Sequence, residues 1–147
     1  ISDSNETCSG RLHRSPMTIV VDTPDFLIER DDARRLIRLR RTESKFSLDK
    51  VDAIFAPVVA ALAEFDGWSL LLDMRRAPPR TDDAFEAAIN VHLNPILVRF
   101  RRRAVLVRSA VGVLQVNRVS KKMGATDDDT AVFRDDEAAA EAFLAAG

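Results

Sequence analysis

Short apolar runs and longer segments with helical spacing alternate along this chain. Thr18 to Asp22 and Phe26 to Glu29 are apolar or β-branched runs separated by a Thr-Pro-Asp turn signal, so they are predicted to be strand or strand-like. In Arg35 to Arg41 the apolar residues alternate with arginines, which predicts a half-exposed strand antiparallel to the preceding one. Such an arginine-rich strand can be a protected edge of a sheet or an edge that pairs with another chain.

The next segment predicts the first helix. Ser47 can cap it, apolar side chains recur at helical spacing from Val51 to Leu62, and Gly67 is a typical helix stop. Pro57 lies inside this segment. Because proline lacks a backbone donor and clashes with the preceding turn, we expect a kink or a late helix start.

Three further strands follow, each succeeded by a helix. The predicted strands are Trp68 to Met74, Ala104 to Val107 and Thr130 to Phe133. The predicted helices start at Asp83, at Val111 and at Asp135; the first is interrupted at Asn94-Pro95, the second stops at Gly124 and the third extends to Ala146. This order predicts an α/β fold in which about four helices flank a single mixed sheet of about five strands, antiparallel at the N-terminal side and mostly parallel later.

Length and composition favour one folded domain. The chain has 147 residues, of which 46% are hydrophobic and 31% charged, the mix of an ordinary globular protein. Ile1 to Pro16 are polar and aperiodic, and they precede Met17, which can be an original start of translation. We expect residues 1–17 to be a flexible or non-native leader and residues 18–147 to form the domain.

Charge and cysteine content narrow the function classes. A formal net charge of -1 gives no global attraction to nucleic acid, so we expect no dedicated nucleic-acid binding. The only cysteine, Cys8, lies in the leader, which excludes an intramolecular disulfide and a cysteine-based metal cluster and favours the cytoplasm. No run approaches the roughly 20 apolar residues of a transmembrane segment. We expect neither a cofactor nor a metal.

Three strings, taken with the element order, carry a family resemblance. They are WSLLLDMRRAP at Trp68 to Pro78, RRRAVLVRSAVGVLQ at Arg101 to Gln115 and AVFRDDEAAAEAFL at Ala131 to Leu144. From roughly Thr18 to Ala146 the chain resembles the SpoIIAA-like family, which belongs to the STAS (sulfate transporter and anti-sigma antagonist) domains. The resemblance implies a mixed sheet flanked by helices. It also implies phospho-regulated exchange of protein partners or an apolar-ligand pocket like that of CRAL-TRIO lipid carriers.

The same resemblance implies a phospho-acceptor at the start of the helix after the central strand. The family has an Asp-Ser-Ser/Thr-Gly motif there, whereas this chain has only Thr81 near the position and lacks the Ser/Thr-Gly element. A phosphate on Thr81 would gain from the helix dipole and be repelled by Asp82 and Asp83. The alternative is that Thr81 is a plain helix cap.

Polar residues follow two of the predicted parallel strands. Because the carboxyl ends of such strands meet at one edge of a sheet, we expect these side chains to form an anion or partner site there. The residues of this site are Asp73, Arg75, Arg76, Arg80, Arg108 and Ser109. The alternative is a set of solvated loop arginines, one of which pairs with Asp73.

Two other features have a functional and a structural interpretation. The densest basic cluster, Arg99 and Arg101 to Arg103 around Phe100, can contact nucleic acid or phospholipid, or it can be the solvated end of a helix. His92 has no histidine or cysteine partner at ligand spacing, so we expect a packed or half-buried side chain.

Three functions remain open from the sequence. The first is a non-enzymatic interaction domain that binds a protein partner through the second helix and the loop from Arg75 to Asp83. The second is a carrier of an apolar small molecule or lipid, in which a pocket beneath that helix is lined by Phe85, Ile89, Leu93 and Leu97. The third, a hydrolase or transferase that uses Arg76, Arg108 and Ser109, lacks a recognisable general base. Homo-oligomerisation stays open.

Overall fold

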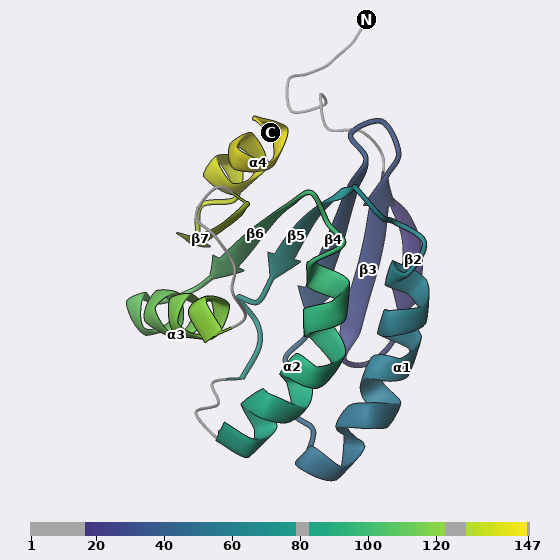
Figure 1. Ribbon diagram of the computed structural model, residues 1–147, viewed down its shortest axis with the longest axis vertical. Coiled ribbons are helices and arrows are strands. Elements are labelled where there is room, and N and C mark those ends of the chain that lie inside the picture. The colour runs from purple at the N-terminus through teal and green to yellow at the C-terminus, as the bar shows by residue number, and fades with distance from the viewer. Residues whose placement is uncertain (1–16, 79–82, 123–128, 147) are drawn as a thin grey trace, which may run out of the picture.

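A six-stranded sheet forms the centre of the computed structural model, which describes residues 17–78, 83–122 and 129–146 (Figure 1). Its strands are β2 (Thr18–Asp22), β3 (Phe26–Asp31), β4 (Leu36–Arg41), β5 (Ser69–Asp73), β6 (Arg102–Val107) and β7 (Thr130–Arg134). The helices are the short 3-10 helix η3 (Leu48–Lys50), α1 (Val51–Leu62), α2 (Asp83–Leu97), α3 (Ala110–Lys122) and α4 (Glu137–Ala145). The predicted leader up to Pro16, together with Arg80, Thr81 and Gly124, lies outside the described residues.

The strands lie in the sheet in the order in which they occur along the chain. β2, β3 and β4 pair antiparallel, and β4 to β7 pair parallel, with α1, α2 and α3 joining the parallel strands. The predicted α/β class with one mixed sheet and four helices is confirmed. The sheet has six strands instead of about five because the two N-terminal runs form separate strands of a hairpin.

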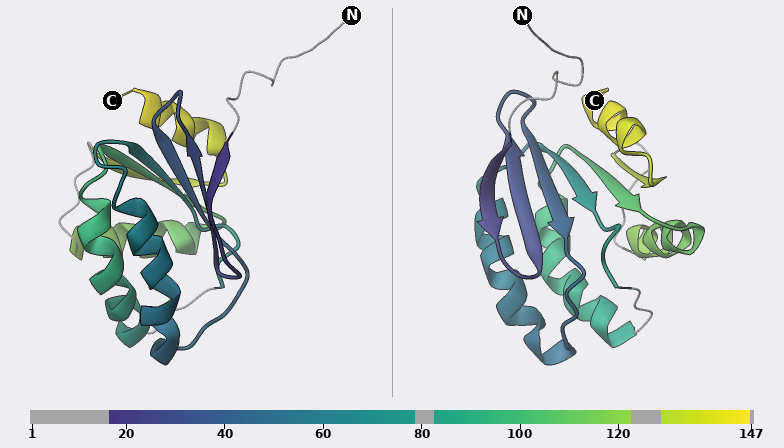
Figure 2. Two further views of the ribbon diagram at one scale, coloured as in Figure 1. Left: turned by 90° about the vertical axis from the view of Figure 1, so that its right-hand side faces the viewer. Right: turned by 180° about the vertical axis from the view of Figure 1, so that it is seen from behind.

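Helices cover both faces of the sheet (Figure 2). α1 and α2 lie on one face, where Phe55 and Val58 of α1 pack with Ile37 and Leu70 in the larger core cluster. α4 lies on the opposite face over β5, β6 and β7, where Leu144 belongs to the smaller cluster. The period-two alternation of strand side chains divides the residues of each strand between these two layers.

β4 lies in the interior of the sheet, between β3 and β5, so the prediction of a half-exposed edge strand is wrong. Arg38 and Arg41 are 6% and 7% exposed. Arg41 donates hydrogen bonds to the Thr42 and Ser44 carbonyl oxygens and lies over the Phe46 ring, 4.6 Å from its centroid. Buried arginines of this kind need acceptors, and the loop after β4 supplies them here.

The predicted interruption of the second helix is also wrong, because α2 runs unbroken through Pro95 to Leu97. α1 likewise contains Pro57 within its length. Both prolines are exposed. A proline leaves the carbonyl four residues earlier without its helical donor, and on the exposed side water can replace that donor.

None of the helices in the described part of the chain combines the length and apolar character that crossing a membrane requires.

Candidate functional site

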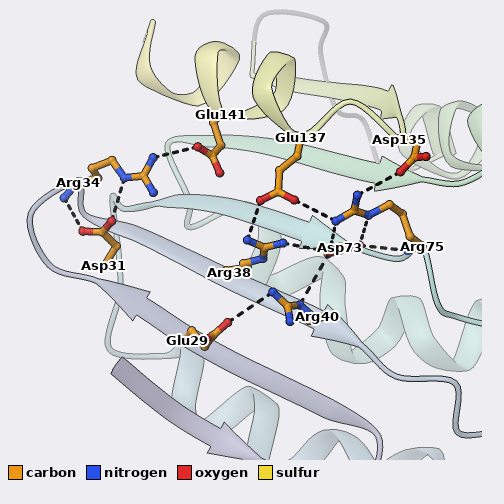
Figure 3. Close-up of polar contacts among 10 residues, drawn as sticks. All are labelled: Glu29, Asp31, Arg34, Arg38, Arg40, Asp73, Arg75, Asp135, Glu137 and Glu141. Carbon is orange, nitrogen blue, oxygen red and sulfur yellow. Dashed lines mark hydrogen bonds and ion pairs between the residues drawn. The ribbon is translucent and has the colours of Figure 1, made fainter. Parts of the chain in front are cut away.

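Ion pairs link the central strands to α4 on the face that α4 covers (Figure 3). Arg38 on β4 donates a hydrogen bond to Asp73 Oδ2, at the end of β5, over 3.3 Å, and another to Glu137 Oε2, at the start of α4, over 2.8 Å. The side chains of Arg38 and Asp73 are only 7% and 6% exposed. This buried pair therefore depends on protein partners, since little water reaches it.

Arg75 joins the same network from the loop after β5. Its guanidinium contacts Asp73 at 2.8 Å, Asp135 at 3.1 Å and Glu137 at 3.0 Å. Asp73 Oδ1 also accepts from the Arg75 backbone N–H, at 3.2 Å, and from Arg75 Nε, at 3.0 Å. Both oxygens of Asp73 are thus occupied by donors within the protein.

Two further arginines extend the network across the sheet (Figure 3). Arg40 lies 3.8 Å from Glu29 and 3.9 Å from Asp73. Arg34 pairs with the fully buried Asp31 at 2.8 Å and with Glu141 of α4 at 3.2 Å. The contacts between Arg34 and Glu141 and between Arg38 and Glu137 fasten α4 to the sheet.

The network contains more carboxylates than guanidinium groups. Arg34, Arg38, Arg40 and Arg75 supply four positive charges, and six negative charges come from Glu29, Asp31, Asp73, Asp135, Glu137 and Glu141. A cluster with an excess of negative charge does not favour an anion. Its geometry fits a structural role in holding α4.

Asp73 is held in its charged form. Burial is the largest single influence on its pKa and raises it, but the hydrogen bonds from the Arg75 side chain and backbone and from Arg38 together outweigh burial and lower the pKa of Asp73 to about 2. A carboxylate with so low a pKa and with both oxygens engaged is a weak proton acceptor near neutral pH. Asp73 therefore does not have the properties of a general base.

The lowered pKa of Asp73 predicts a pH dependence of stability. A carboxyl whose pKa is lower in the folded than in the unfolded chain adds stability above the unfolded value, and that stability is lost as the pH falls through the folded value. With an unfolded pKa of about 3.9 and the folded pKa of about 2, we expect the free energy of unfolding to drop by about 2 kcal/mol between pH 4 and pH 2 from this group. Urea unfolding at a series of pH values gives the free energy of unfolding as a function of pH. Between pH 4 and pH 2 this free energy should fall less steeply for Asp73→Asn than for the unaltered chain. An equally steep fall in both proteins would contradict the lowered pKa of Asp73.

The residues of the predicted anion or partner site lie in different surroundings. Asp73 and Arg75 contact each other within the network. Arg76 is exposed after β5, while Arg108 and Ser109 are exposed after β6. Ser109 Oγ accepts from the Gly112 backbone N–H at 3.1 Å, so it caps the first turn of α3. Among the described residues, the structure gives no contact that joins Arg108 or Ser109 to Asp73, and the anion site stays a prediction.

The basic cluster of residues 99 to 103 is used inside the fold. Arg103 is 7% exposed and donates to the Leu97 and Phe100 carbonyl oxygens. Arg102 lies over the Phe143 ring, 4.0 Å from its centroid. The interpretation as a solvated helix end is wrong for these two residues, because β6 starts at Arg102 rather than at Ala104.

The proposed pocket residues contribute to the core. Phe85 is buried, and Ile89, Leu93 and Leu97 are partly buried against the larger cluster. His92 on the same helix is half-buried, as expected: its ring stacks on Phe55 with 5.6 Å between centroids, and Nε2 lies 2.7 Å from Asp52 Oδ1. The four proposed pocket residues thus pack in or against the core, and an apolar-ligand pocket beneath α2 stays a prediction.

The outer side of α2 is uncharged and apolar. After Asp83, the exposed residues of the helix are Ala84, Ala87, Val91 and Pro95, and Val98, just beyond its end, continues the same spacing. Val91 and Val98 are 72% and 66% exposed. A surface helix normally presents polar side chains to water, so an apolar outer side is unusual.

α1 has an outer side of the same kind, made of small residues. From Ala53 to Ala63, its exposed residues are Ala53, Ala56, Pro57, Ala60 and Ala63. α1 and α2 lie side by side in all views, and contacts between Phe55 and His92 and from Arg99 to the Ala63 carbonyl oxygen join them (Figures 1 and 2). The two stripes form one surface, which we call the α1–α2 face: Ala53, Ala56, Pro57, Ala60, Ala63, Ala84, Ala87, Val91, Pro95 and Val98.

Sequence reasoning missed most of the network and the composition of the α1–α2 face. The signals existed: Arg38 and Arg40 share one face of a strand by their spacing of two, and Glu137 and Glu141 share one side of a helix by their spacing of four.

In the described ranges, no group of three or more histidine, cysteine, aspartate and glutamate side chains is placed to hold a metal ion.

Comparison with known proteins gives no relative for this chain. No protein-family model, no curated protein and no solved structure matches it. The resemblance to SpoIIAA-like domains therefore stays a prediction from the sequence.

Proposed function

We propose that this chain is a non-enzymatic protein-interaction domain of the SpoIIAA-like, STAS-related type, which docks its partner on the α1–α2 face. The observation that carries the proposal is the outer side of α2, where an exposed helix presents Val91 and Val98 and no exposed charge between Ala84 and Val98. Large exposed apolar surfaces on soluble domains commonly mark interaction sites.

Two further observations support binding over catalysis. The buried carboxylate of Asp73 is neutralised by Arg38 and Arg75, so the most polar part of the fold serves to hold α4. The side chains beneath α2 pack into the core, which suits a helix that binds with its outer side. Support for the STAS-related type comes from the three sequence strings and from the mixed sheet flanked by helices.

Site-specific photo-crosslinking tests the proposal in the organism that makes the protein. A photoreactive residue replaces Val91 on α2 in one variant and Val111 on α3 in the control, since Val111 is similarly exposed at 70%. We expect a crosslink to one defined protein from position 91 and none to that protein from position 111. Equal crosslinking from both positions, or none from either, would contradict docking on the α1–α2 face.

Native mass spectrometry of the same purified protein separates the carrier alternative. An apolar small molecule retained in the native spectrum and lost on denaturation would overturn the proposal in favour of a carrier. We expect the mass of the polypeptide without such a molecule.

A further inference from the structure

We propose that α4 is a removable cover of the sheet. It opens at a hinge formed by Asp135 and Asp136 and unfolds, while the six strands and the layer of α1 and α2 stay folded. This inference does not rest on the proposed docking surface, because α4 lies on the opposite face of the sheet (Figure 2). Three observations carry it: how little of α4 is buried, which contacts hold it, and which charges its departure leaves behind.

Little of α4 is buried against the sheet. Only Ala140 and Leu144 of its nine residues are buried, and Phe143 is partly buried with the Arg102 guanidinium over its ring. Four of the 12 residues of α1 are buried, and all four are large: Val51, Phe55, Val58 and Leu62. An isolated helix of nine residues is not stable in water, so α4 unfolds once it leaves the sheet.

The remaining contacts of α4 are polar and partly exposed. Glu137 and Glu141 are 25% and 21% exposed, and Arg34, which pairs with Glu141, is 37% exposed. At the other end of the helix, Arg101 donates a hydrogen bond to the Leu144 carbonyl oxygen over 2.9 Å. Water replaces contacts of this kind at little cost in free energy. They determine where α4 lies more than how firmly it is held.

The charges left behind by α4 keep partners within the sheet. Arg38 loses its partner on α4, but its hydrogen bond to Asp73 joins the neighbouring strands β4 and β5. Asp73 also keeps Arg75, which follows it directly after β5, and the fully buried Asp31 keeps Arg34. The main cost of breaking a buried ion pair is a buried charge without any partner. Opening of α4 creates no such charge in this network.

The hinge lies outside the strand ladder. β7 pairs with β6 as far as Arg134, and the two residues that follow connect it to α4. Asp135 has the left-handed backbone, with a φ of 49°. Within the described residues, α4 is the only helix that contributes to the smaller core cluster. Its opening therefore uncovers an apolar strip across β4, β5 and β6, which in the closed protein is at most 4% exposed: Leu36, Leu71, Ala104 and Leu106.

Hydrogen exchange of the full chain tests the proposal. Exchange is followed by mass spectrometry of peptic peptides at several urea concentrations below the unfolding transition. The peptide of residues 137–146 reports on α4, and a peptide that contains β5 reports on the sheet. Two variants are compared with the unaltered chain: Ala142→Gly in α4 and, as the matched control, Ala60→Gly in α1. Both alanines are exposed near the end of a helix, so each substitution weakens its helix without changing the core.

We expect the amides of α4 to exchange at least about 100-fold faster than those of β5, at a rate nearly independent of urea, because the opening exposes little surface. Ala142→Gly should accelerate exchange in α4 about 5-fold, which corresponds to the helix penalty of glycine. Ala60→Gly destabilises the closed and the opened protein equally relative to the unfolded chain. It should therefore accelerate exchange in β5 about 5-fold and in α4 less than about 2-fold.

Three results would overturn the inference. If α4 exchanges as slowly as β5 and with the same urea dependence, it opens only when the whole domain unfolds. Equal acceleration of both peptides in Ala60→Gly leads to the same conclusion. If β5 exchanges as fast as α4 without urea dependence, the sheet does not stay folded when α4 leaves. None of these results bears on the crosslinking from position 91, so the proposed function is tested separately.

Discussion

Asp73→Ala is expected to lower the free energy of unfolding by about 3 kcal/mol at pH 7, because it removes one of the two carboxylates that compensate the buried charge of Arg38. The Arg38 side chain is 7% exposed, and in this variant it keeps only Glu137 of its two carboxylate partners. Arg75 loses the residue that occupies most of its donors. Urea or guanidinium unfolding, followed by circular dichroism, measures the change.

Asp135→Asn provides the control for Asp73→Ala. Asp135 contacts the same guanidinium, that of Arg75, but its side chain is 64% exposed, so we expect a loss of about 0.5 kcal/mol. Asparagine tolerates the left-handed backbone of this residue, whose φ is 49°, so the substitution adds little strain. Similar losses in both variants would show that burial does not determine the strength of these pairs.

Apolar replacement of both members of the buried pair is a second test of the explanation that an uncompensated buried charge causes the loss. The double variant Arg38→Met and Asp73→Leu removes both buried charges at once. Because burying charges carries a desolvation cost, we expect this variant to be more stable than Asp73→Ala by about 2 kcal/mol. A double variant as unstable as the single one would mean that geometry, and not uncompensated charge, causes the loss.

Phe55→Ala is expected to lower the free energy of unfolding by about 4 kcal/mol, the largest effect we predict. Phe55 is 2% exposed at the centre of the contacts between α1, α2 and the sheet. Its ring lies 5.1 Å from that of Phe26, 6.4 Å from that of Phe46 and 5.6 Å from that of His92. Removing it opens a cavity that three aromatic neighbours cannot close without leaving their positions.

Val91→Ala and Phe55→Leu are the controls for Phe55→Ala. Val91 is 72% exposed, so its truncation should change stability by less than about 0.5 kcal/mol. Leucine at position 55 keeps most of the buried volume, and we expect a loss of about 1.5 kcal/mol. Thermal unfolding monitored by calorimetry gives all three values, and a loss in Phe55→Ala as small as that in Phe55→Leu would show that the cluster repacks.

Most of the fold could be predicted from the sequence because local patterns determine it. The apolar run of β5 and the periodic stripes of α1 and α2 define the layers, and the alternation of strands and helices defines the parallel half of the sheet. β4 could not be predicted correctly, since an apolar and arginine alternation is typical of a half-exposed strand. Its burial depends on α4, whose glutamates come about a hundred residues later in the chain.

The candidate surface could be predicted only in outline. The sequence predicted that α2 forms part of a partner surface, but helical spacing does not show which side of a helix faces the sheet when apolar residues occur on nearly every side. The packing of Ile96 inward and the exposure of Val91 settle that point. The ion pairs of Asp73 with Arg38 needed the parallel register of β4 and β5 as well.

The attachment of α4 has a consequence for how the protein folds during synthesis. The hydrogen bonds from Arg34 to Glu141 and from Arg38 to Glu137 span 107 and 99 positions of the chain. A nascent chain that has emerged from the ribosome only as far as β6 can form the layer of α1 and α2. Its Arg38 cannot yet form the ion pair with Glu137, because α4 has not been synthesised. Such long-range closure slows folding, so we expect this domain to reach its native state only after residue 141 has left the ribosome.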